Sequence, residues 1–251
     1  MIQSTMRRNP MAVRLEQDVS VISQSFETAS PEEVIRWAAR TFGDGLVMTS
    51  SFGADSAVLL HLATREMPRI RVIFIDTGFL FPETHTYAEQ LRRLLDLNIW
   101  YYRTRNDPFA YLESAGEEDF RHRRDVARCC AANKNEPMER AMRDLAPAAW
   151  LRGIRRAQSE SRRNRQFVEW SARYSCYAIS PLLNWSDTDI EEYLRKNDLP
   201  RHPLAAFGYR SIGCSPLTCT RPVEGDEDPR SGRWAGSSKT ECGLHLEDYQ
   251  I

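Results

Sequence analysis

Residues 45–62 read GLVMTSSFGADSAVLLHL, and the fold class can be inferred outward from this stretch. The apolar run at its start predicts a short buried strand over 45–51, and the pattern after the turn predicts a helix from Ala54 to Arg65. Between them, serines and a glycine would present hydroxyls and backbone N–H groups at the helix N-terminus, where anions bind. A turn of this composition is more often structural, so on its own it is a candidate binding loop and nothing more.

The same alternation of strand and helix continues along the chain. RVIFID (71–76) predicts a second buried strand, followed by the loop TGFLFPE and an amphipathic helix through Leu95. Further strands are predicted over 98–102, 150–154 and 177–183. Short apolar strands that alternate with helices indicate an α/β fold with a mostly parallel sheet covered by helices on both faces.

Helix signals mark the rest of the chain. Residues 11–26 carry a loose helical pattern, and Ser30, Pro31 and Glu33 form a helix start with a capping box. Ser186 with Asp189 predicts one more capped helix, which ends near Asn197. From these signals we divide the chain into a helical extension (1–29), a nucleotide-binding α/β domain (30–207) and a loop-rich C-terminal segment (208–251).

Composition narrows the function classes. The 251 residues include 34 basic and 35 acidic side chains, and the net charge of −1 gives no reason to expect nucleic-acid or membrane binding. No apolar run is long enough to span a bilayer, and the N-terminus does not read as a signal peptide, so we expect a cytoplasmic protein. Six cysteines in that compartment are more often metal ligands or catalytic thiols than disulfides.

Three predicted loops would meet at the carboxyl edge of the sheet, where nucleotides bind in such folds. They are Ser50–Ser56, Asp76–Gly78 and the arginine-rich stretch that begins at Gly153. An acidic residue at a strand end suits a ribose or an amino group, and arginines suit phosphate or sulfate. From the residues alone, plain turns and a solvated charged loop explain the last two loops equally well.

The cysteines are more specific. Cys129 and Cys130 are adjacent, and Cys214 and Cys219 lie five positions apart in a Gly/Pro loop. Two distant pairs fit four thiolates around one iron–sulfur cubane or one zinc ion, although small buried thiols remain an alternative. We expect Cys176 to be a core residue.

Cys242 stands apart in a polar stretch, Glu241-Cys242-Gly243-Leu244-His245. A thiol there could enter a site and then turn to a partner, unless it is an ordinary surface cysteine.

Taken together, these stretches resemble the APS/PAPS reductase family, the sulfonucleotide reductases, from about Ser25 to His245. The similarity is to its iron–sulfur-containing assimilatory members, which act on adenosine 5'-phosphosulfate (APS). The matching stretches are SSFGADSAVLLHL, IDTGFLFPET, CC followed by NKNEPM, WLRGIRRAQSESR, SPLLNWSDTDI, HPL, GYRSIGC, TRPVEG, DPRSGRW and KTECGLH.

The resemblance implies an adenine nucleotide α-hydrolase-like fold and thioredoxin-dependent adenylyl-sulfate reductase activity. Cys242 would attack the sulfate sulfur, expel AMP and form an S-sulfocysteine, from which thioredoxin or glutaredoxin releases sulfite. The nucleotide would be bound by Ser50, Ser51, Phe52, Gly53, Ser56, Asp76, Thr77, Gly78 and Arg155. The residues near the sulfate or the nucleophile would be Lys134, Arg230, Arg233 and His245.

It also implies one [4Fe–4S] cluster, with Cys129, Cys130, Cys214 and Cys219 as ligands. Family members that carry these cysteine pairs generally use APS, and those without them use the 3'-phosphorylated form, PAPS. One departure is that the second pair is usually Cys-x-x-Cys, whereas here it is two residues longer.

Three alternatives remain. The closest is a PAPS reductase or a dual-specificity enzyme. The second is a PP-loop ATP pyrophosphatase or tRNA sulfurtransferase, a class that normally has a second glycine where Phe52 stands. The third is a non-catalytic nucleotide sensor stabilised by zinc or a cluster, against which the ECGLH stretch argues. The oligomeric state is not predicted.

Overall fold

The computed structural model describes residues 10–115, 123–215, 219–225, 228, 230–234, 239, 241 and 244 of the 251-residue chain. The α-helices in this part are α1 (Pro10–Ser25), α2 (Pro31–Phe42), α3 (Ser56–Glu66), α4 (Pro82–Leu95), α5 (Pro108–Ala115), α6 (Arg123–Cys130), α7 (Glu136–Leu145) and α8 (Asp187–Lys196). The strands are β1 (Leu46–Thr49), β2 (Arg71–Asp76), β3 (Asn98–Arg103), β4 (Ala149–Leu151), β5 (Val168–Ser171) and β6 (Cys176–Ile179).

These strands form one six-stranded sheet in the order β3-β2-β1-β4-β6-β5. Every neighbouring pair is parallel except β5 with β6. Because the chain runs outward from β1 to β3 on one side and resumes at β4 on the other, the strand order reverses between β1 and β4. In open parallel sheets, ligands bind beyond the carboxyl ends of the strands at such a reversal.

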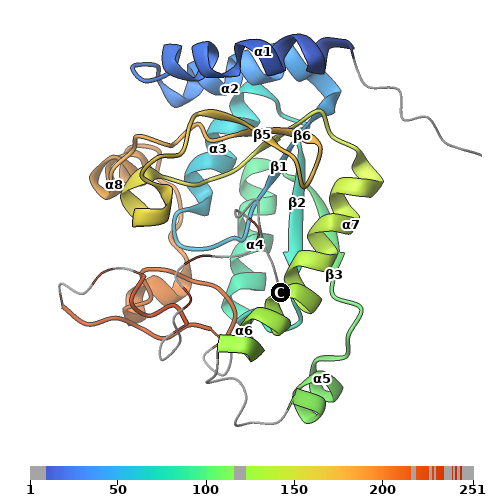
Figure 1. The fold of residues 1–251 in the computed structure, drawn as a ribbon. Coiled ribbons are helices and arrows are strands. Elements are labelled where there is room, and N and C mark those ends of the chain that lie inside the picture. The colour runs from blue at the N-terminus through green and yellow to red at the C-terminus, as the bar shows by residue number, and fades with distance from the viewer. Residues whose placement is uncertain are drawn as a thin grey trace, which may run out of the picture.

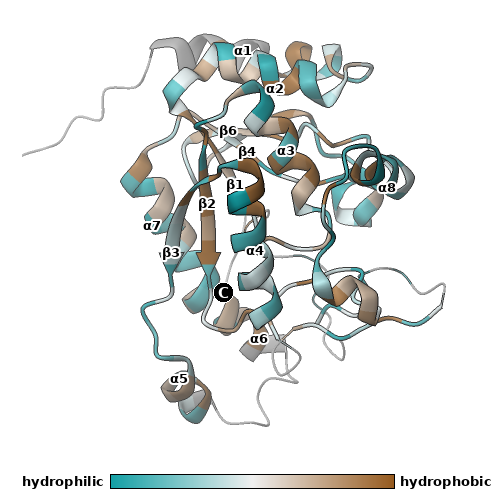
Figure 2. Cartoon of the chain, turned by 180° about the vertical axis from the view of Figure 1, so that it is seen from behind, coloured by the Kyte–Doolittle hydropathy of each residue, from teal (hydrophilic) through white to brown (hydrophobic). Residues whose placement is uncertain are grey.

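Helices cover both faces of the sheet, as the sequence predicts. On one face α2, α3, α4 and α8 pack against the strands, and Leu15, Val19 and Ile22 of α1 join this core. On the other face Met138, Ala141 and Met142 of α7 pack on the strands. Figure 2 shows the result in the hydropathy pattern, because β2 is hydrophobic between its two polar end residues while α4 carries polar residues on its outer side. The predicted α/β class is confirmed.

Local sequence signals account for several element boundaries. Ser30 caps α2 and Ser186 caps α8, each with a reciprocal capping box, and β2 spans the predicted 71–76. The fourth strand is shorter than predicted, because it ends at Leu151 before the arginine-rich loop. The sequence pattern did not predict β5 or the helices between 104 and 145.

The C-terminal segment lies at the carboxyl end of the sheet. Figure 1 shows it in orange at the end toward which the β2 arrow points, where α6 also lies, whereas α1 and α2 lie at the opposite end. Contacts between Leu80 and Cys214, and a hydrogen bond from the Ser215 N–H to the Phe79 carbonyl (2.7 Å), hold it to the loop after β2. Within the described ranges, none of the helices is long and apolar enough to cross a membrane. The domain limits at 29 and 207 remain a prediction.

His202 is a buried titratable group that joins the short helical turn Pro203–Phe207 to α4. Its Nδ1 accepts a hydrogen bond from the Leu204 N–H (3.2 Å), which leaves Nε2 to donate to the Thr84 hydroxyl (3.1 Å). The side chain is 1% exposed, and burial lowers its pKa from 6.5 to about 4. The imidazole is therefore neutral in the folded protein at neutral pH.

This burial predicts an acid-sensitive contribution to stability. The unfolded chain binds a proton at His202 near pH 6.5, whereas the folded chain resists protonation until about pH 4, so stability is lost as the pH falls through this interval. Between pH 7.5 and pH 5 the loss should be about 2 kcal/mol. In His202→Asn, the amide oxygen can replace Nδ1 as acceptor, and the pH dependence should weaken by that amount. Urea unfolding at both pH values measures it. The half-exposed His85→Asn is the control, and equal pH dependence in the wild type and His202→Asn would contradict the assignment.

Candidate active site

A cavity of about 1160 Å³ opens at the carboxyl edge of the sheet, where the strand order reverses. Its walls come from three loops that the sequence analysis selected, after β1, β2 and β4, together with the first part of α8 and the C-terminal segment. Predicted site residues that line it are Ser50, Ser51, Gly53, Ser56, Thr77, Lys134, Arg155, Cys214, Arg230 and Arg233. The cavity thus gathers predicted site residues from positions 50 to 233 of the chain.

The loop after β1 presents the N-terminus of α3 to the cavity. The N-cap residue Asp55 makes no capping hydrogen bond with its side chain, so this carboxylate does not satisfy the first N–H groups of the helix. Ser51, Gly53 and Ser56 line the cavity beside them. The Ser56 and Val58 N–H groups donate to the carbonyls of Gly53 and Asp55, at 3.1 and 3.2 Å. The serine hydroxyls and the remaining N–H groups are what this turn can offer an anion, and anion binding here stays a prediction.

Phe52 supports this loop from beneath and does not line the cavity. Its φ of 48° lies in the left-handed region, which glycine adopts more readily than other residues, and a glycine is what the PP-loop alternative would place here. The ring is fully buried, with its centroid 4.7 Å from that of Phe74 in an edge-on arrangement. The Phe52 N–H donates to the Ser50 hydroxyl (3.1 Å), which shapes the turn.

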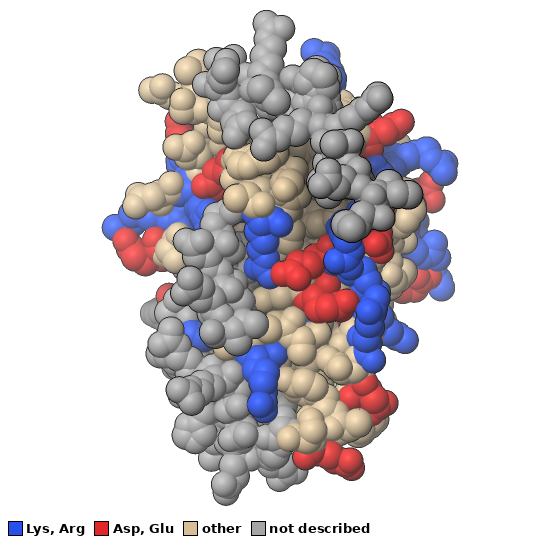
Figure 3. Space-filling view, turned by 45° about the vertical axis from the view of Figure 1, so that its right-hand side comes forward, with Lys and Arg blue, Asp and Glu red and all other residues tan. Residues whose placement is uncertain are grey.

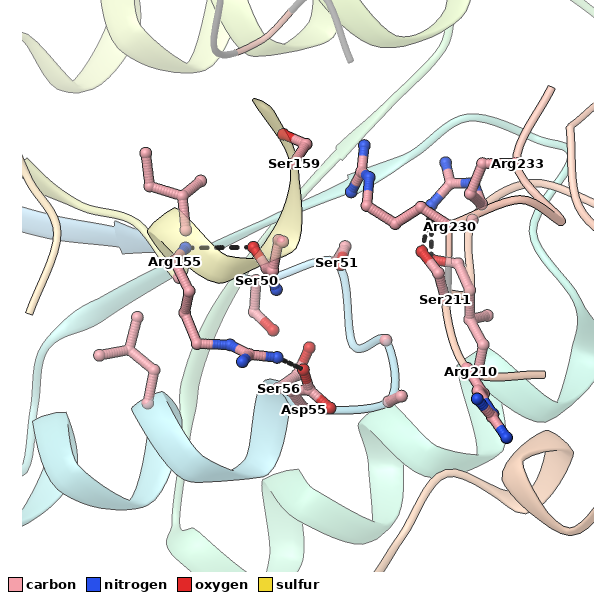
Figure 4. A pocket seen from close by; sticks show the side chains of 18 of the residues that line it. Ser50, Ser51, Asp55, Ser56, Arg155, Ser159, Arg210, Ser211, Arg230 and Arg233 are labelled. Atoms are coloured by element: carbon pink, nitrogen blue, oxygen red, sulfur yellow. Dashed lines mark hydrogen bonds and ion pairs between the residues drawn. The ribbon is translucent and has the colours of Figure 1, made fainter. Parts of the chain in front are cut away.

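Arg155 lies across the cavity from the C-terminal segment, with its guanidinium held by two carboxylates. It pairs with Asp55 and with Asp187, each at 2.7 Å, and is 3% exposed. Figure 4 shows Arg155, Asp55, Ser50 and Ser56 on one side of the cavity, with Arg210, Arg230 and Arg233 on the other. Arg155 therefore ties the first turn of α3 to that of α8, and nucleotide binding by it stays a prediction.

The loop after β2 connects the cavity to the cysteines. Asp76 and Gly78 do not line the cavity: the Asp76 carboxylate accepts from the Gly78 N–H (3.0 Å) and pairs with Arg103 (2.8 Å). Gly78 needs its positive φ of 77°, and a Cβ there would lie 2.7 Å from Pro108. The Thr77 hydroxyl lies 3.3 Å from the Cys214 sulfur.

The four cysteines of the two predicted pairs converge beside the cavity. The Cys219 thiol hydrogen-bonds to both Cys130 and Cys214, and Asn133 donates to the Cys129 sulfur (3.7 Å). Cys130, Cys219 and Trp234 share one small apolar cluster. Cys176 lies elsewhere, in β6, with no exposed surface, which confirms its place in the core.

A π-helical turn, Ala131–Asn135, follows Cys130 and carries Lys134 into the cavity wall. Such turns are rare and occur often at functional sites. It leads directly into α7, so one continuous helical segment supplies the adjacent cysteines, Lys134 and the apolar side chains that pack on the sheet.

Hydrogen bonds and nearby cations favour negative charge on two of the thiols. The hydrogen bond from Cys219 lowers the pKa of Cys214 to about 6, and Lys134 acts in the same direction. The pKa of Cys130 is also lowered, first by Cys219 and then by Lys239 and Lys134. Burial raises the pKa of Cys129 to about 12, and the same hydrogen bonds raise that of Cys219, their donor.

The thiols of this cluster are, by their chemistry, suited to an iron–sulfur centre or to zinc. Four thiols from two distant segments meet beside lysines, and thiolates are the usual ligands of such centres and of zinc. Their sulfurs are hydrogen-bonded to one another rather than spread around an ion, and among the described residues no group of three or more His, Cys, Asp or Glu is arranged to hold a metal ion. Residues 216–218 of the lengthened loop lie outside the described part.

Positive charge gathers around Trp234 at this end of the cavity. Arg230, Arg233 and Lys239 lie 5.7, 4.6 and 5.4 Å from the centre of its indole ring, within cation–π range. The Arg233 guanidinium also donates to the Ile212 carbonyl (3.3 Å), and it packs so closely on Gly213 that a Cβ there would lie 2.3 Å away. Lys134 completes this cationic end of the cavity wall.

The model of the phosphoadenosine phosphosulfate reductase domain matches residues 45–222. This chain belongs to that family. An adenosine 5'-phosphosulfate reductase of Streptomyces coelicolor is 40% identical over 227 residues, which cover 88% of this chain and 91% of the relative. A phosphoadenosine 5'-phosphosulfate reductase of Synechococcus is 44% identical over 222 residues, which cover 85% and 91%. The phosphoadenylyl-sulfate (PAPS) reductase of Candida auris has the same fold, with a TM-score of 0.67, 26% identity, and coverage of 79% of this chain and 95% of that one.

As a member of the phosphoadenosine phosphosulfate reductase family, the chain has an adenine nucleotide α-hydrolase-like fold. Its relatives are named for two different substrates, so family membership leaves the choice between APS and PAPS open. The family model ends at 222, before Arg230, Arg233 and the ECGLH stretch.

Two predicted residues of this family member, Cys242 and His245, lie outside the described residues, and their roles stay predictions. The sequence analysis missed the carboxylates that hold Arg155, and also Trp234 and Glu241. Asp55 and Asp187 stand beside serines at helix starts, which was the one available signal for them. Nothing in the pattern indicated which arginine would pair with Glu241.

Proposed function

We propose that this protein is an assimilatory adenylyl-sulfate reductase, which converts APS to sulfite and AMP. The Cys242 thiolate attacks the sulfate sulfur, a sulfur–sulfur bond forms, and the bond from sulfur to the bridging oxygen breaks. AMP leaves with that electron pair on its phosphate. A dithiol of the thioredoxin or glutaredoxin type then attacks Cys242, releases sulfite and becomes a disulfide, which balances the two electrons taken up by sulfur.

The observation that carries this proposal is the continuity of the cavity. One end has the N-terminus of α3, which no side chain caps, with its serines, and the other has Lys134, Arg230 and Arg233 beside the converged cysteines. A nucleotide phosphosulfate needs both ends, since its adenosine and its sulfate must bind in one site. Cations at the second end would stabilise the thiolate and the charge that passes to the leaving phosphate.

A [4Fe–4S] cluster would be held by Cys129, Cys130, Cys214 and Cys219. When bound, it would supply an electrostatic and structural element near the sulfate. Its four thiolates carry negative charge, so attraction of the substrate falls to the chain's own cations, with Lys134 between cluster and cavity. Arg233, held by Ile212 and packed on Trp234, would be fixed in orientation for the sulfate.

The test is to mix the protein with APS in the absence of reductant and measure the intact mass. One added SO₃ per chain is expected, lost again as sulfite on addition of thioredoxin and its reductase. Absence of an adduct, together with no sulfite after reductant is added, would contradict the proposed function.

The preference for APS over PAPS rests on which arginines are available for a 3'-phosphate. Arg162 and Arg163, in the loop after β4, were the candidates from the sequence. Arg162 is engaged by Glu241 at 2.6 Å, and the exposed Arg163 pairs with Glu160 at 2.6 Å. Without a free arginine fork there, the extra phosphate gains little from either, and the cysteine pairs also accompany APS use in the resembled family.

We therefore predict that kcat/KM is at least about tenfold higher for APS, a difference of about 1.4 kcal/mol. Because the same argument applies to the products, AMP should inhibit more strongly than adenosine 3',5'-bisphosphate. Parallel assays with both substrates and both inhibitors measure this. Equal turnover of PAPS would support the dual-specificity alternative and leave the reaction type intact.

The tRNA sulfurtransferase alternative is disfavoured by family membership and by the charge distribution. RNA binding is driven by clustered positive charge. The face in Figure 3 carries Lys and Arg side chains directly beside Asp and Glu side chains, in keeping with the net charge of −1.

A further inference from the structure

Glu241 lies in a buried polar clamp at the edge of the cavity. The Arg162 guanidinium binds its carboxylate in a bidentate manner, with Nε at 2.6 Å and a terminal nitrogen at 2.8 Å. The hydroxyls of Ser159 and Ser161 each donate to it at 3.4 Å, and Arg230 approaches to 3.3 Å. Glu241 is 5% exposed and Arg162 is 6% exposed.

The clamp around Glu241 is connected by hydrogen bonds to Arg155, on the side of the cavity formed by the loops after β1 and β4. Arg162 also donates to the side chain of Gln158, which accepts a further hydrogen bond from the Arg155 N–H (3.1 Å). Arg155 in turn holds the N-termini of α3 and α8 together. A rigid path therefore runs from the anion-binding loop to Glu241, 79 positions beyond Arg162 in the chain.

Burial of this pair is difficult to explain as a source of stability. Removing two charges from water costs about as much as their attraction returns, so buried ion pairs are weak stabilisers that specify geometry in some proteins. Glu241 directly precedes Cys242, and consecutive Cα atoms are about 3.8 Å apart. Whatever fixes Glu241 therefore limits where the Cys242 thiol can be.

We infer that Glu241 is a positioning residue for the nucleophile. The clamp of Arg162, Ser159, Ser161 and Arg230 holds the segment before Cys242 against the cavity, in the arrangement from which the thiolate reaches the sulfate sulfur. Glu241 itself contacts no reacting atom. Arg230 takes part in both functions, because it contacts Glu241 and lines the cationic end of the cavity. This inference rests on the proposed function, since it concerns the approach of Cys242 to APS.

Loss of the Glu241 carboxylate should slow the attack of Cys242 on APS while leaving nucleotide affinity unchanged. In Glu241→Gln, the charge that Arg162 grips is gone, and the S-sulfonation rate in a single turnover with APS should fall by about 100-fold, the usual cost of a misplacement of about 1 Å. The dissociation constant of AMP should stay within about twofold of the wild-type value, because the nucleotide loop is untouched. Quenched-flow intact mass gives the rate, and calorimetry gives the affinity.

A double-mutant cycle tests whether the pair acts as a unit. Arg162→Met should slow S-sulfonation to a similar extent, and the double variant should be no slower than either single variant. Glu66→Gln is the matched control, since Glu66 forms a bidentate pair with Arg36 between α2 and α3, and it should react at the wild-type rate.

Two results would overturn the inference: S-sulfonation of Glu241→Gln within about threefold of the wild-type rate, or a loss of AMP affinity that matches the loss of rate. The second outcome would assign Glu241 to substrate binding or to general structure. Failure of the proposed function is a separate observation, because then the wild-type protein itself would form no adduct.

Discussion

Replacing Cys242 with serine should abolish sulfite release from APS, with residual activity below about one thousandth of the wild-type value. A serine hydroxyl, whose proton is far less acidic than that of a thiol, is a far weaker nucleophile than a thiolate held near cations. Because the nucleotide loop and the four clustered cysteines are unchanged, AMP affinity and iron content should stay at wild-type levels. A sulfite assay, calorimetry with AMP and iron analysis measure the three quantities.

The adduct provides the complementary test of the same residue. Peptide mapping of wild-type protein after reaction with APS should place the added SO₃ on Cys242, and the Cys242→Ser variant should gain no mass. If the adduct lies on Cys130 or Cys214, the two thiols whose pKa values are lowered, the nucleophile has been misassigned.

Loss of the cluster is the second large effect. Cys219 occupies the junction of the cysteine group, since its thiol contacts both Cys130 and Cys214. In Cys219→Ser, a poor iron ligand replaces the thiolate, and iron content should fall from about four per chain to below about one. Anaerobic purification, iron and sulfide analysis and the visible absorption of the protein measure the result. Cys129→Ser, Cys130→Ser and Cys214→Ser should behave alike.

Cys176→Ser is the control for these variants, because Cys176 is also a free cysteine but is buried in β6 within the sheet core. It should keep its full iron content. Retention of full iron by Cys219→Ser instead would show that the lengthened loop has lost its ligand, and a cluster with three cysteine ligands would be the better description.

The elements that were predicted correctly are those with local signals. The interior of β2, Val72 to Ile75, is an uninterrupted apolar run, and α2 and α8 begin at serines that form capping boxes, so nearby residues define them. β5 carries no such signal. Its four residues, VEWS, form a strand because they pair antiparallel with β6, and this tertiary partner is not visible in their own pattern.

The site shows the same limit. The three loops that line the cavity could be predicted because each comes after a predicted strand. The meeting of the two cysteine pairs could be predicted because four thiolates commonly bind one cluster or one metal ion. The partners of the arginines could not be predicted, because nearly all of the 34 basic residues are arginines and any carboxylate has many possible partners. Arg155 meets Asp55 from 100 positions away, and Arg162 meets Glu241 from 79. Such pairs are set by how the loops pack, and that information lies in no single stretch.

The π-helical turn between α6 and α7 has a consequence for how the cysteines are aimed. A π turn holds one more residue between hydrogen-bonded partners than an α turn does, and one residue corresponds to about 100° of rotation around a helix axis. The apolar side of α7 is fixed by Met138, Ala141 and Met142 against the sheet. Cys129 and Cys130 lie beyond the turn, so their direction is offset from that side by the extra residue. The direction of the two thiols is therefore set by the length of this turn. A change in the turn can rotate Cys129 and Cys130 about the helix axis without changing how α7 packs on the sheet.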